Sequence, residues 1–495
     1  MKFRITSWTS YLPWLLLLMA SYVPVFHQLG TEPVKTFDES LFALRAYWLA
    51  EHGEYLNNFK EFPNGPSATN LKTPLFSGVQ ALSFLLLGYT EFALRLPVAL
   101  MVLAIFFLMY VSGKYIVDPV YGWASILVLL ASWGFFHAHA ARTGAHDVPL
   151  SFFLLLSAWS LYRYVEAPSR KWLWMVALAT WAAMMTKGVA GAFWLPAFAV
   201  YLSIQQGWRP LLADKQAWLA MGTVLLLLVG YYAYREWDFP GFLAQLWKGE
   251  LGGHYLRTHD GHDSPALWYV QRLATVRYSY WVWWLPLSWV MMLLPAMRPL
   301  RNWLLLMNLA SLSQLLIISS SATKLEWYDV PMYAPMAMSI GAIFWLVWKK
   351  AILVLTDKTW IRSVVVLGLV VAIWLPAYVP IFQKNLRSEY LDYPGERFGG
   401  LMKQGARIFP DLKEYTLFYS QFSTHCLFYR MVYNDHKGYD ITRKRVMSEL
   451  ETGEVVMICE PAIWEALQHD FIIEPLTSKD GCYLAKLVAR LPLPD

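Results

Sequence analysis

The chain of 495 residues is too apolar for a water-soluble protein, since 57% of its residues are hydrophobic and only 15% are charged. Its mean hydropathy of +0.36 predicts a polytopic α-helical membrane protein. The formal net charge of +6 is explained by basic residues that orient spans and attract membrane lipids, so no nucleic-acid partner is expected.

About eleven apolar segments approach the length of roughly 20 residues that a membrane-spanning helix needs. The first follows Lys2 and Arg4 without a small-residue cleavage site, so we interpret it as an uncleaved span rather than a signal peptide. The predicted spans are residues 11–29, 93–117, 119–136, 148–165, 171–186, 188–205, 217–235, 270–296, 302–321, 328–348 and 361–382.

Basic residues recur in alternate short loops, which the positive-inside rule assigns to the cytoplasm together with the N-terminus. The outer face of the membrane then receives the other loops and the tail, which makes the C-terminal domain extracytoplasmic. The basic residues are Lys114, Arg163, Arg170, Lys171, Arg209, Lys215, Arg298, Arg301, Lys349, Lys350, Lys358 and Arg362. The outer loops are residues 30–92, 137–147, 236–269 and 322–327.

The first outer loop carries an acid pair and a lone lysine. Asp38 and Glu39 precede a run over residues 40–52 that is typical of a helix lying in the membrane interface. The helix macrodipole favours the Asp38 anion. This carboxylate either takes part in catalysis or only caps the helix. Lys72 follows a turn-rich stretch and lies where it either meets a lipid phosphate or extends its ammonium to the interface.

A second polar cluster, residues 323–331, joins two predicted spans on the same face. Its Lys324 and Tyr328 point into the compartment that contains Lys72. Cations and hydroxyls that converge from distant loops are what an anionic leaving group requires. The two clusters together indicate chemistry on an anionic lipid.

The tail, residues 383–495, is predicted to form a small α/β domain beside a membrane domain of residues 1–382. Residues 415–419, 455–459 and 482–488 have strand patterns, and 461–469 has a helix pattern with Pro at its first turn. No nucleophile elbow, phosphate loop or metal spacing occurs in it, which favours a lid or an acceptor-docking module. Its three cysteines, in an oxidising compartment, allow one disulfide of undetermined pairing. They are Cys426, Cys459 and Cys482.

Several short motifs follow one another along residues 30–340. They are Asp38-Glu39, Lys72-x-Pro74-Leu75, Glu91-x-Ala93-x-Arg95-Leu96-Pro97, Ala141-Arg142-Thr143-Gly144 with Asp147, Thr186-Lys187-Gly188, His262 to Pro265 with Trp268-Tyr269, and Lys324-Leu325 to Pro331 with Pro335. In order and spacing the set resembles the bacterial GT-C glycosyltransferases, a group that includes the lipid A aminoarabinose transferase and the protein O-mannosyltransferases. Two positions depart from that pattern: Thr73 replaces a common proline, and Asp329 replaces an apolar residue.

The resemblance implies a GT-C fold with about eleven or more transmembrane helices and juxtamembrane helices in the first outer loop. It further implies an inverting transfer of a sugar from a polyprenyl-monophosphate donor to an envelope lipid, glycan or protein acceptor. Catalytic roles then fall on Asp38, as general base or acceptor orienter, supported by Glu39 or Asp147. Donor-phosphate binding falls on Lys72, Arg142, Lys324 and Tyr328, and candidate substrate contacts are Lys187, Arg257 and His262.

Several alternatives stay open. Arg142 and Asp147 either serve the reaction or form a structural ion pair at a helix end, and Lys187 either serves it or marks a tight outer turn. No cofactor is expected, although a divalent cation is an alternative at the polar cluster His254, His259, Asp260, His262 and Asp263. The rival functions are an oligosaccharide transferase or polymerase, a transporter or flippase of lipid-linked sugars, and a membrane anchor for the outer domain.

Overall fold

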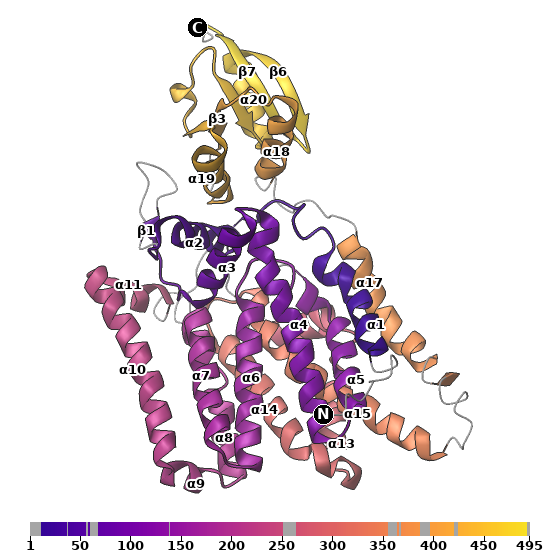
Figure 1. The fold of residues 1–495 in the computed structure, drawn as a ribbon. Coiled ribbons are helices and arrows are strands. Elements are labelled where there is room, and N and C mark those ends of the chain that lie inside the picture. Colours follow the sequence, from indigo (N-terminus) through magenta and orange to yellow (C-terminus); the bar gives the residue numbers. More distant parts are fainter. Residues whose placement is uncertain are drawn as a thin grey trace, which may run out of the picture. The chain divides into compact units, whose positions relative to one another are not determined.

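The computed structural model describes residues 11–36, 38–55, 58–59, 68–137, 139–250, 264–354, 364–365, 368–386, 397–419 and 424–492. The chain divides into two compact units (Figure 1). The first comprises Met1–His27, Leu71–Phe76 and Val98–Arg387, and the second comprises Gln28–Asn70, Ser77–Pro97 and Ser388–Asp495. The predicted domain boundary between residues 382 and 383 stays a prediction.

The first unit is helical. Its long helices are α4 (Glu91–Ile116, from Val98 onward), α6 (Asp147–Glu166), α7 (Arg170–Lys187), α10 (Lys215–Asp238), α14 (Arg301–Ser320) and α15 (Tyr333–Val354). Between and around them lie α1 (Leu12–Ser21), α5 (Pro119–Leu130), α8 (Leu195–Ile204), α9 (Trp208–Ala213), α11 (Phe242–Leu246), α12 (Trp268–Arg272), α13 (Trp284–Met291) and α17 (Leu375–Leu386).

Six helical stretches within the described residues are long and apolar enough to cross a membrane. They are Glu91–Ile116, Asp147–Glu166, Arg170–Ala192, Lys215–Asp238, Pro295–Ser320 and Glu326–Lys350. Four shorter apolar helices accompany them, at Leu12–Phe26, Leu75–Leu87, Pro119–Leu130 and Leu195–Ile204. The chain is therefore a multi-pass membrane protein, and the larger predicted number of spans stays a prediction.

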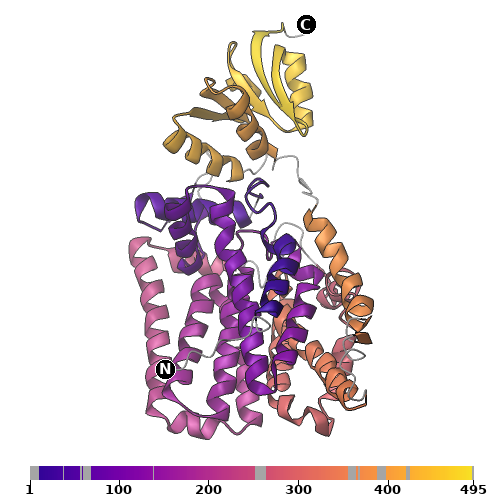
Figure 2. The ribbon, with the colours of Figure 1, turned by 45° about the vertical axis from the view of Figure 1, so that its right-hand side comes forward.

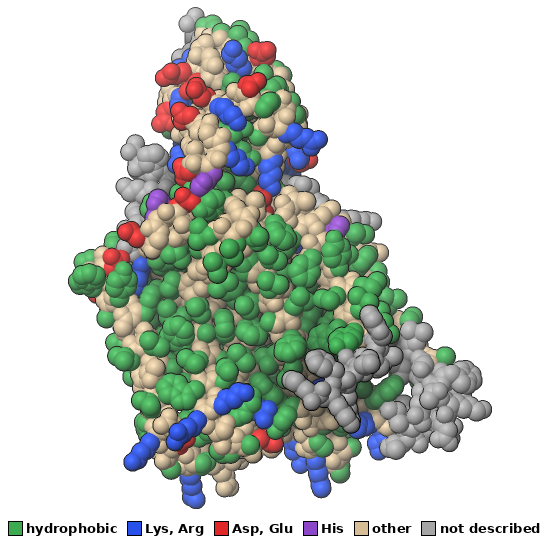
Figure 3. All heavy atoms as spheres, in the orientation of Figure 1, with side chains coloured by type: hydrophobic (Ala, Val, Ile, Leu, Met, Phe, Trp, Pro, Cys, Tyr) green, Lys and Arg blue, Asp and Glu red, His purple; other side chains and the backbone are tan. Residues whose placement is uncertain are grey.

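The surface of the helical unit suits a hydrocarbon surrounding. Helix α10 is hardly buried in the protein and exposes Leu225, Leu226 and Val229. Hydrophobic side chains cover the face of the helical unit seen in Figure 3, and Lys and Arg side chains gather at its end near α9. An apolar flank that ends in a basic rim is the pattern expected of a membrane domain.

The span predicted over residues 270–296 is interrupted. After α12 the helix widens to a π-turn, η6 (Leu273–Arg277), then turns before α13, and the 3-10 segment η7 (Pro295–Leu300) leads into α14. The turn brings the buried indole of Trp281 within 2.9 Å of the Ala131 carbonyl oxygen, to which its Nε1 donates. Hydropathy alone does not detect this break, because the residues on both sides of the turn are apolar.

The second unit contains helix α2 (Asp38–His52), the short hairpin β1 (Asn58–Phe59) and β2 (Ala68–Thr69), most of α3 (Leu75–Leu87) and the first turns of α4. The helix predicted over residues 40–52 is confirmed as α2. Its acid at the first position fits the macrodipole argument, since Asp38 is the first helical residue.

The C-terminal part of this unit is a five-stranded mixed sheet of order β4-β3-β5-β7-β6 (Figure 2). Its strands are β3 (Glu414–Phe418), β4 (Asp440–Lys444), β5 (Val455–Ile458), β6 (Phe471–Lys479) and β7 (Cys482–Arg490). The predicted α/β fold of the tail is confirmed, with three of the strands and helix α20 (Pro461–Asp470) close to their predicted ranges. Strands β4 and β6 and helices α18 (Phe398–Ile408) and α19 (Thr424–Lys437) were not predicted.

The two faces of the sheet pack into different apolar cores, because neighbouring residues of a strand point to opposite sides of the sheet. Phe418 and Ile458 pack with Leu467 of α20 on one face. Leu417 belongs to the core on the other face, which also contains Tyr429 of α19. That second core extends to residues of α2, such as Ala43, Leu44 and Tyr47, so the C-terminal sheet and α2 share one apolar core.

The register of the sheet determines which two cysteines form the disulfide. Ile458 of β5 pairs with Tyr483 of β7 in antiparallel fashion, so the next residue, Cys459, stands opposite Cys482. These two cysteines form the disulfide. Cys426 is buried in α19, with its Sγ 3.4 Å from the Nε2 of His425.

A polar cluster ties α19 to the start of α4 within the second unit. The Tyr429 hydroxyl donates to Glu91 at 2.5 Å and accepts from the backbone nitrogen of Val34 at 2.8 Å. Burial, and then the nearby Glu91 carboxylate, raise the pKa of Tyr429 well above its usual value, so the phenol stays protonated as a donor. Lys403 of α18 reaches the same carboxylate at 2.5 Å.

Candidate active site

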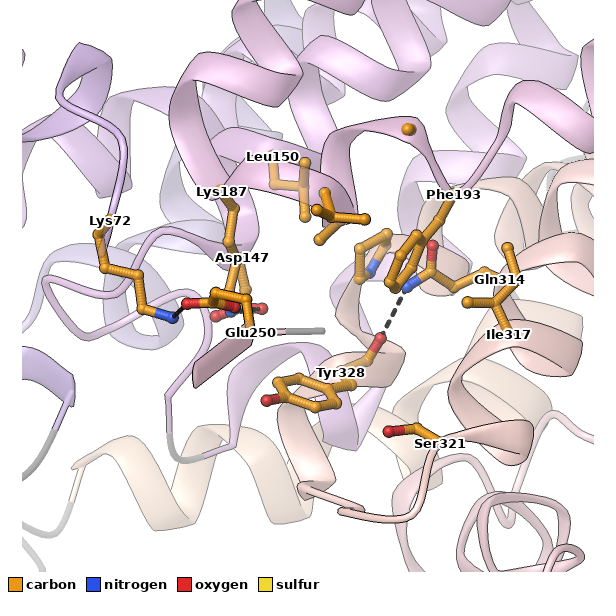
Figure 4. Close-up of a pocket in the computed structure, with 14 residues that line it drawn as sticks. Lys72, Asp147, Leu150, Lys187, Phe193, Glu250, Gln314, Ile317, Ser321 and Tyr328 are labelled. Carbon is orange, nitrogen blue, oxygen red and sulfur yellow. Dashed lines mark hydrogen bonds and ion pairs between the residues drawn. The ribbon is translucent and has the colours of Figure 1, made fainter. Parts of the chain in front are cut away.

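A cavity of about 380 Å³ lies inside the first unit, where several helices end (Figure 4). Its wall is mostly apolar, with a charged group on one side and a smaller polar group across from it. The lining residues are Lys72, Asp147, Leu150, Lys187, Val189, Ala190, Ala192, Phe193, Glu250, Gln314, Ile317, Ser321, Tyr328 and Pro331.

Asp147 and Lys187 face the cavity from two packed helices. Asp147 is the first residue of α6, and Lys187 is the last residue of α7, which ends because Gly188 takes a positive φ of 57°. A carboxylate at a helix start and a cation at a helix end are both favoured by the macrodipoles. The Lys187 ammonium donates to Asp147 Oδ1 at 2.5 Å and lies 5.6 Å from the centroid of the Tyr328 ring.

Lys72 and Glu250 form the second ion pair of the cavity. The Lys72 ammonium lies 2.6 Å from Glu250 Oε1, and about 30% of each side chain is exposed (31% and 29%). The backbone of this segment is held in place, because the amide of Gly188 donates to Thr73 Oγ1 at 3.3 Å. The threonine that departs from the family pattern therefore has a local partner beside Lys187.

Across the cavity from these charges lie Gln314 of α14 and Tyr328 of the 3-10 segment η8 (Glu326–Met332). The Gln314 side-chain amide donates to the carbonyl oxygen of Tyr328 at 3.0 Å. Phe193 and Ile317 stand close by in the same wall. One end of the cavity is thus ionic, and the other combines apolar side chains with the Gln314 amide and the Ser321 and Tyr328 side chains.

The structure places two predicted phosphate ligands outside the cavity wall. Arg142 is half-buried and donates to the carbonyl oxygens of Val23 at 2.9 Å and of His27 at 2.8 Å. Lys324 is buried and donates to the carbonyl oxygen of Ser321 at 2.6 Å. Lys324 thus supports a residue of the wall, whereas Lys72, Asp147, Lys187 and Tyr328 line the cavity themselves.

Asp38 and Glu39 belong to the second unit and are not among the residues that line this cavity. Asp38 is half-buried at the start of α2. Glu39 is fully buried, and its carboxylate accepts from Arg95 Nε at 2.7 Å and from Arg95 Nη2 at 2.9 Å. A doubly engaged, buried carboxylate fits a role in positioning α2 better than direct contact with substrate. Arg257 and His262 lie outside the described residues.

One ionic cluster was missed by the sequence analysis. Arg277 of η6 meets Asp329 of η8 with two hydrogen bonds of 2.6 Å, and the Tyr333 hydroxyl donates to the same carboxylate at 2.8 Å. All three side chains are buried. Charged residues inside two predicted spans were the available signal, since such residues are costly unless they pair. The unusual Asp329 is explained by this pairing.

Within the described residues, no group of three or more His, Cys, Asp or Glu side chains is arranged to hold a metal ion. The alternative cation site at His254, His259, Asp260, His262 and Asp263 lies outside those residues. The cavity already contains two ammonium groups, those of Lys72 and Lys187, which can neutralise an anion.

Sequence comparison matches one part of the chain. Residues 71–233 match the family described as dolichyl-phosphate-mannose-protein mannosyltransferase. An uncharacterised protein of Aquifex aeolicus (strain VF5) is 30% identical over 187 residues, which make up 38% of this chain and 36% of that protein. The match thus spans about a third of that relative's length.

Solved structures match a much larger part. ArnT from Cupriavidus metallidurans bound to undecaprenyl phosphate has a TM-score of 0.67 at 17% identity, over 97% of this chain and 98% of that one. The apo oligosaccharyltransferase of Archaeoglobus fulgidus has a TM-score of 0.52 at 11% identity, over 85% of this chain and 64% of that one. The chain has the GT-C fold. The resemblance to GT-C membrane glycosyltransferases is confirmed, as is the small C-terminal sheet of the predicted fold class.

Proposed function

We propose that the chain is an inverting glycosyltransferase that moves a sugar from a polyprenyl-monophosphate donor to an acceptor on the outer face of the bacterial inner membrane. The observation that carries this proposal is a cavity in a GT-C fold that combines the ammonium groups of Lys72 and Lys187 with the carboxylate of Asp147. Such a cavity offers two cations to an anionic leaving group. The Asp147 carboxylate holds one of these cations, Lys187, in position.

The reaction needs cations that neutralise the leaving phosphate and a base that takes the acceptor proton. An acceptor oxygen attacks the anomeric carbon, the bond from that carbon to the phosphate oxygen breaks, and polyprenyl monophosphate leaves with the bonding electrons. The acceptor proton passes to a general base, a role that the family resemblance assigns to Asp38. Lys72, which is partly exposed, neutralises the phosphate, while Asp147 pairs with Lys187 and directs its ammonium at the cavity.

Helix direction supports action on the outer face. Helix α7 begins with Arg170 and Lys171 and ends at Lys187 in the cavity, so the basic loop and the cavity lie at opposite ends of the same helix. If basic loops are cytoplasmic, the cavity opens toward the outside. The same assignment makes the N-terminus cytoplasmic and the C-terminal sheet periplasmic, where its disulfide is stable.

The size and the wall of the cavity favour one sugar per transfer. A volume of about 380 Å³ lies near the lower end of the range of about 300–1,000 Å³ that is usual for small-ligand pockets. The structural likeness to an oligosaccharyltransferase keeps transfer of a larger glycan as the second candidate. We propose no cofactor, and an envelope glycolipid or protein as the acceptor.

The test is mass spectrometry of envelope glycolipids and glycoproteins from cells that carry the intact protein, a deletion, Asp38→Asn or Asp147→Asn. A sugar lost in the deletion, and lost in both variants while each is still made and folded, supports the transferase. Loss of about a hundredfold or more in rate is expected for a general base. The control is Asp440→Asn, an exposed aspartate of β4, which should retain the sugar.

Two other outcomes would overturn the proposal. Accumulation of a lipid-linked intermediate on the cytoplasmic side in the deletion strain would favour a transporter or flippase. An unchanged envelope in both variants, with the change confined to the deletion, would favour an anchor that holds the C-terminal domain at the membrane.

The proposal that no divalent cation takes part has its own test. Sugar transfer should then continue in the presence of a metal chelator.

A further inference from the structure

The cation best placed to receive the donor phosphate is already occupied. The Lys72 ammonium lies 2.6 Å from Glu250 Oε1, and both residues line the cavity. In Figure 4 the two side chains point toward each other at the ionic end of the cavity. A phosphate and a carboxylate are both oxyanions that compete for the same ammonium donor, so they cannot be bound there independently.

The exposure of this pair distinguishes it from two buried ion pairs of the protein. The Glu39 carboxylate, with Arg95, is fully buried, as is the Asp329 carboxylate with Arg277. About 30% of each partner is exposed in the pair of Lys72 with Glu250 (31% and 29%). A pair in contact with solvent is weak, so a stronger anion can replace the carboxylate at little cost.

The neighbouring pair does not offer the same exchange. The Asp147 side chain is only 2% exposed, and Lys187 is 12% exposed. A carboxylate that is so deeply buried would be left without its cation if a ligand took Lys187 away. Of the two cavity pairs, the exposed one is therefore where an incoming oxyanion is expected to enter.

We propose that Glu250 is an internal competitor for the donor phosphate, which occupies Lys72 in the empty enzyme and gives it up when a polyprenyl monophosphate binds. This inference rests on the proposed function and adds a residue that sets donor affinity. Glu250 holds the Lys72 side chain in the cavity while the donor is absent, and its negative charge opposes binding of a second oxyanion. Release of the product is helped by the returning carboxylate.

The experiment uses the full-length protein in detergent micelles, with undecaprenyl phosphate as the probe and intrinsic tryptophan fluorescence as the readout. Glu250→Gln removes the charge and keeps the shape, so the Kd should fall by about threefold to tenfold relative to the wild type. Glu250→Asp keeps the charge and should bind no more tightly than the wild type. The matched control is Glu454→Gln, whose partly exposed pair with Lys444 lies in the C-terminal sheet, and its Kd should not change.

A double-mutant cycle separates competition from a general electrostatic or structural effect. A Lys72→Gln background lacks the ammonium group that Glu250 contacts, so Glu250→Gln should lose most of its advantage. An equal gain in both backgrounds would overturn the proposal, as would a weaker Kd in Glu250→Gln, which would make Glu250 a ligand of the substrate.

The same measurements separate failure of this inference from failure of the proposed function. If Lys72→Gln binds undecaprenyl phosphate as well as the wild type does, the donor-phosphate role of Lys72 is wrong. If Lys72→Gln weakens binding while Glu250→Gln leaves the Kd unchanged, Lys72 keeps its role and only the competition by Glu250 is refuted.

Discussion

Two ion pairs of the helical unit have the same chemistry and different surroundings. Arg277 and Asp329 are almost fully buried, and the Tyr333 hydroxyl adds a further hydrogen bond to the carboxylate. The Lys72 ammonium lies 2.6 Å from Glu250 Oε1, and both side chains are partly exposed at a cavity. The comparison teaches that burial, more than residue type, separates charges that hold the fold from charges that are available to a ligand.

The largest effect is expected from breaking the buried pair. Asp329→Ala leaves the Arg277 guanidinium buried without its anion, which should lower the free energy of unfolding by about 3–5 kcal/mol. Tryptophan fluorescence during denaturant unfolding in detergent measures this loss. Replacing both partners by apolar residues, as in R277M/D329L, should restore much of the stability. A fully stable Asp329→Ala protein would refute the structural role of the pair.

A smaller loss is expected at the buried pair of the second unit. Arg95 also donates to the backbone carbonyls of Leu29, Glu32 and Pro33, so it keeps partners when Glu39 becomes Gln. Glu39→Gln should therefore cost about 2 kcal/mol of unfolding free energy, measured in the same way. If its stability were unchanged and its transfer rate fell by a hundredfold, the catalytic role predicted for Glu39 would be favoured instead.

The cavity pair should show the reverse pattern. Lys72→Met removes a partly exposed contact, so the free energy of unfolding should change by no more than about 1 kcal/mol. The affinity for undecaprenyl phosphate should fall by about tenfold to a hundredfold, because a charge-assisted hydrogen bond contributes about 1.5–3 kcal/mol. A large loss of stability without a change in Kd would place Lys72 among the structural charges.

The smallest effect is expected at the basic end of the helical unit. Lys349 lies 3.4 Å from Asp118 Oδ2, and 51% of its side chain is exposed. Asp118 keeps other partners, the amide of Val120 and the indole of Trp345. Lys349→Gln should therefore change the unfolding free energy by less than about 0.5 kcal/mol and leave donor affinity unaltered. A larger change would show that exposure is a poor guide to the role of a charge in this protein.

Local patterns carried much of the prediction. Hydropathy predicted a membrane protein. Periodicity predicted helix α2, helix α20 and three strands of the tail, because the pattern of each element lies within one short stretch of sequence. Of the candidate residues, Lys72, Asp147, Lys187 and Tyr328 do line one cavity. Their ordered motifs were enough to indicate the GT-C fold, which the structural comparison confirms.

Pairings over long sequence distances were decided by the tertiary structure alone. The sequence left open whether Arg142 pairs with Asp147. In the structure Asp147 forms an ion pair with Lys187, and Arg142 donates to two backbone carbonyl oxygens. Glu250 was not singled out, since nothing local connects it to Lys72. The choice of Cys459 and Cys482 for the disulfide likewise depends on strand register. Composition and periodicity are properties of neighbouring residues, whereas ion pairs and registers depend on which distant segments the packing brings together.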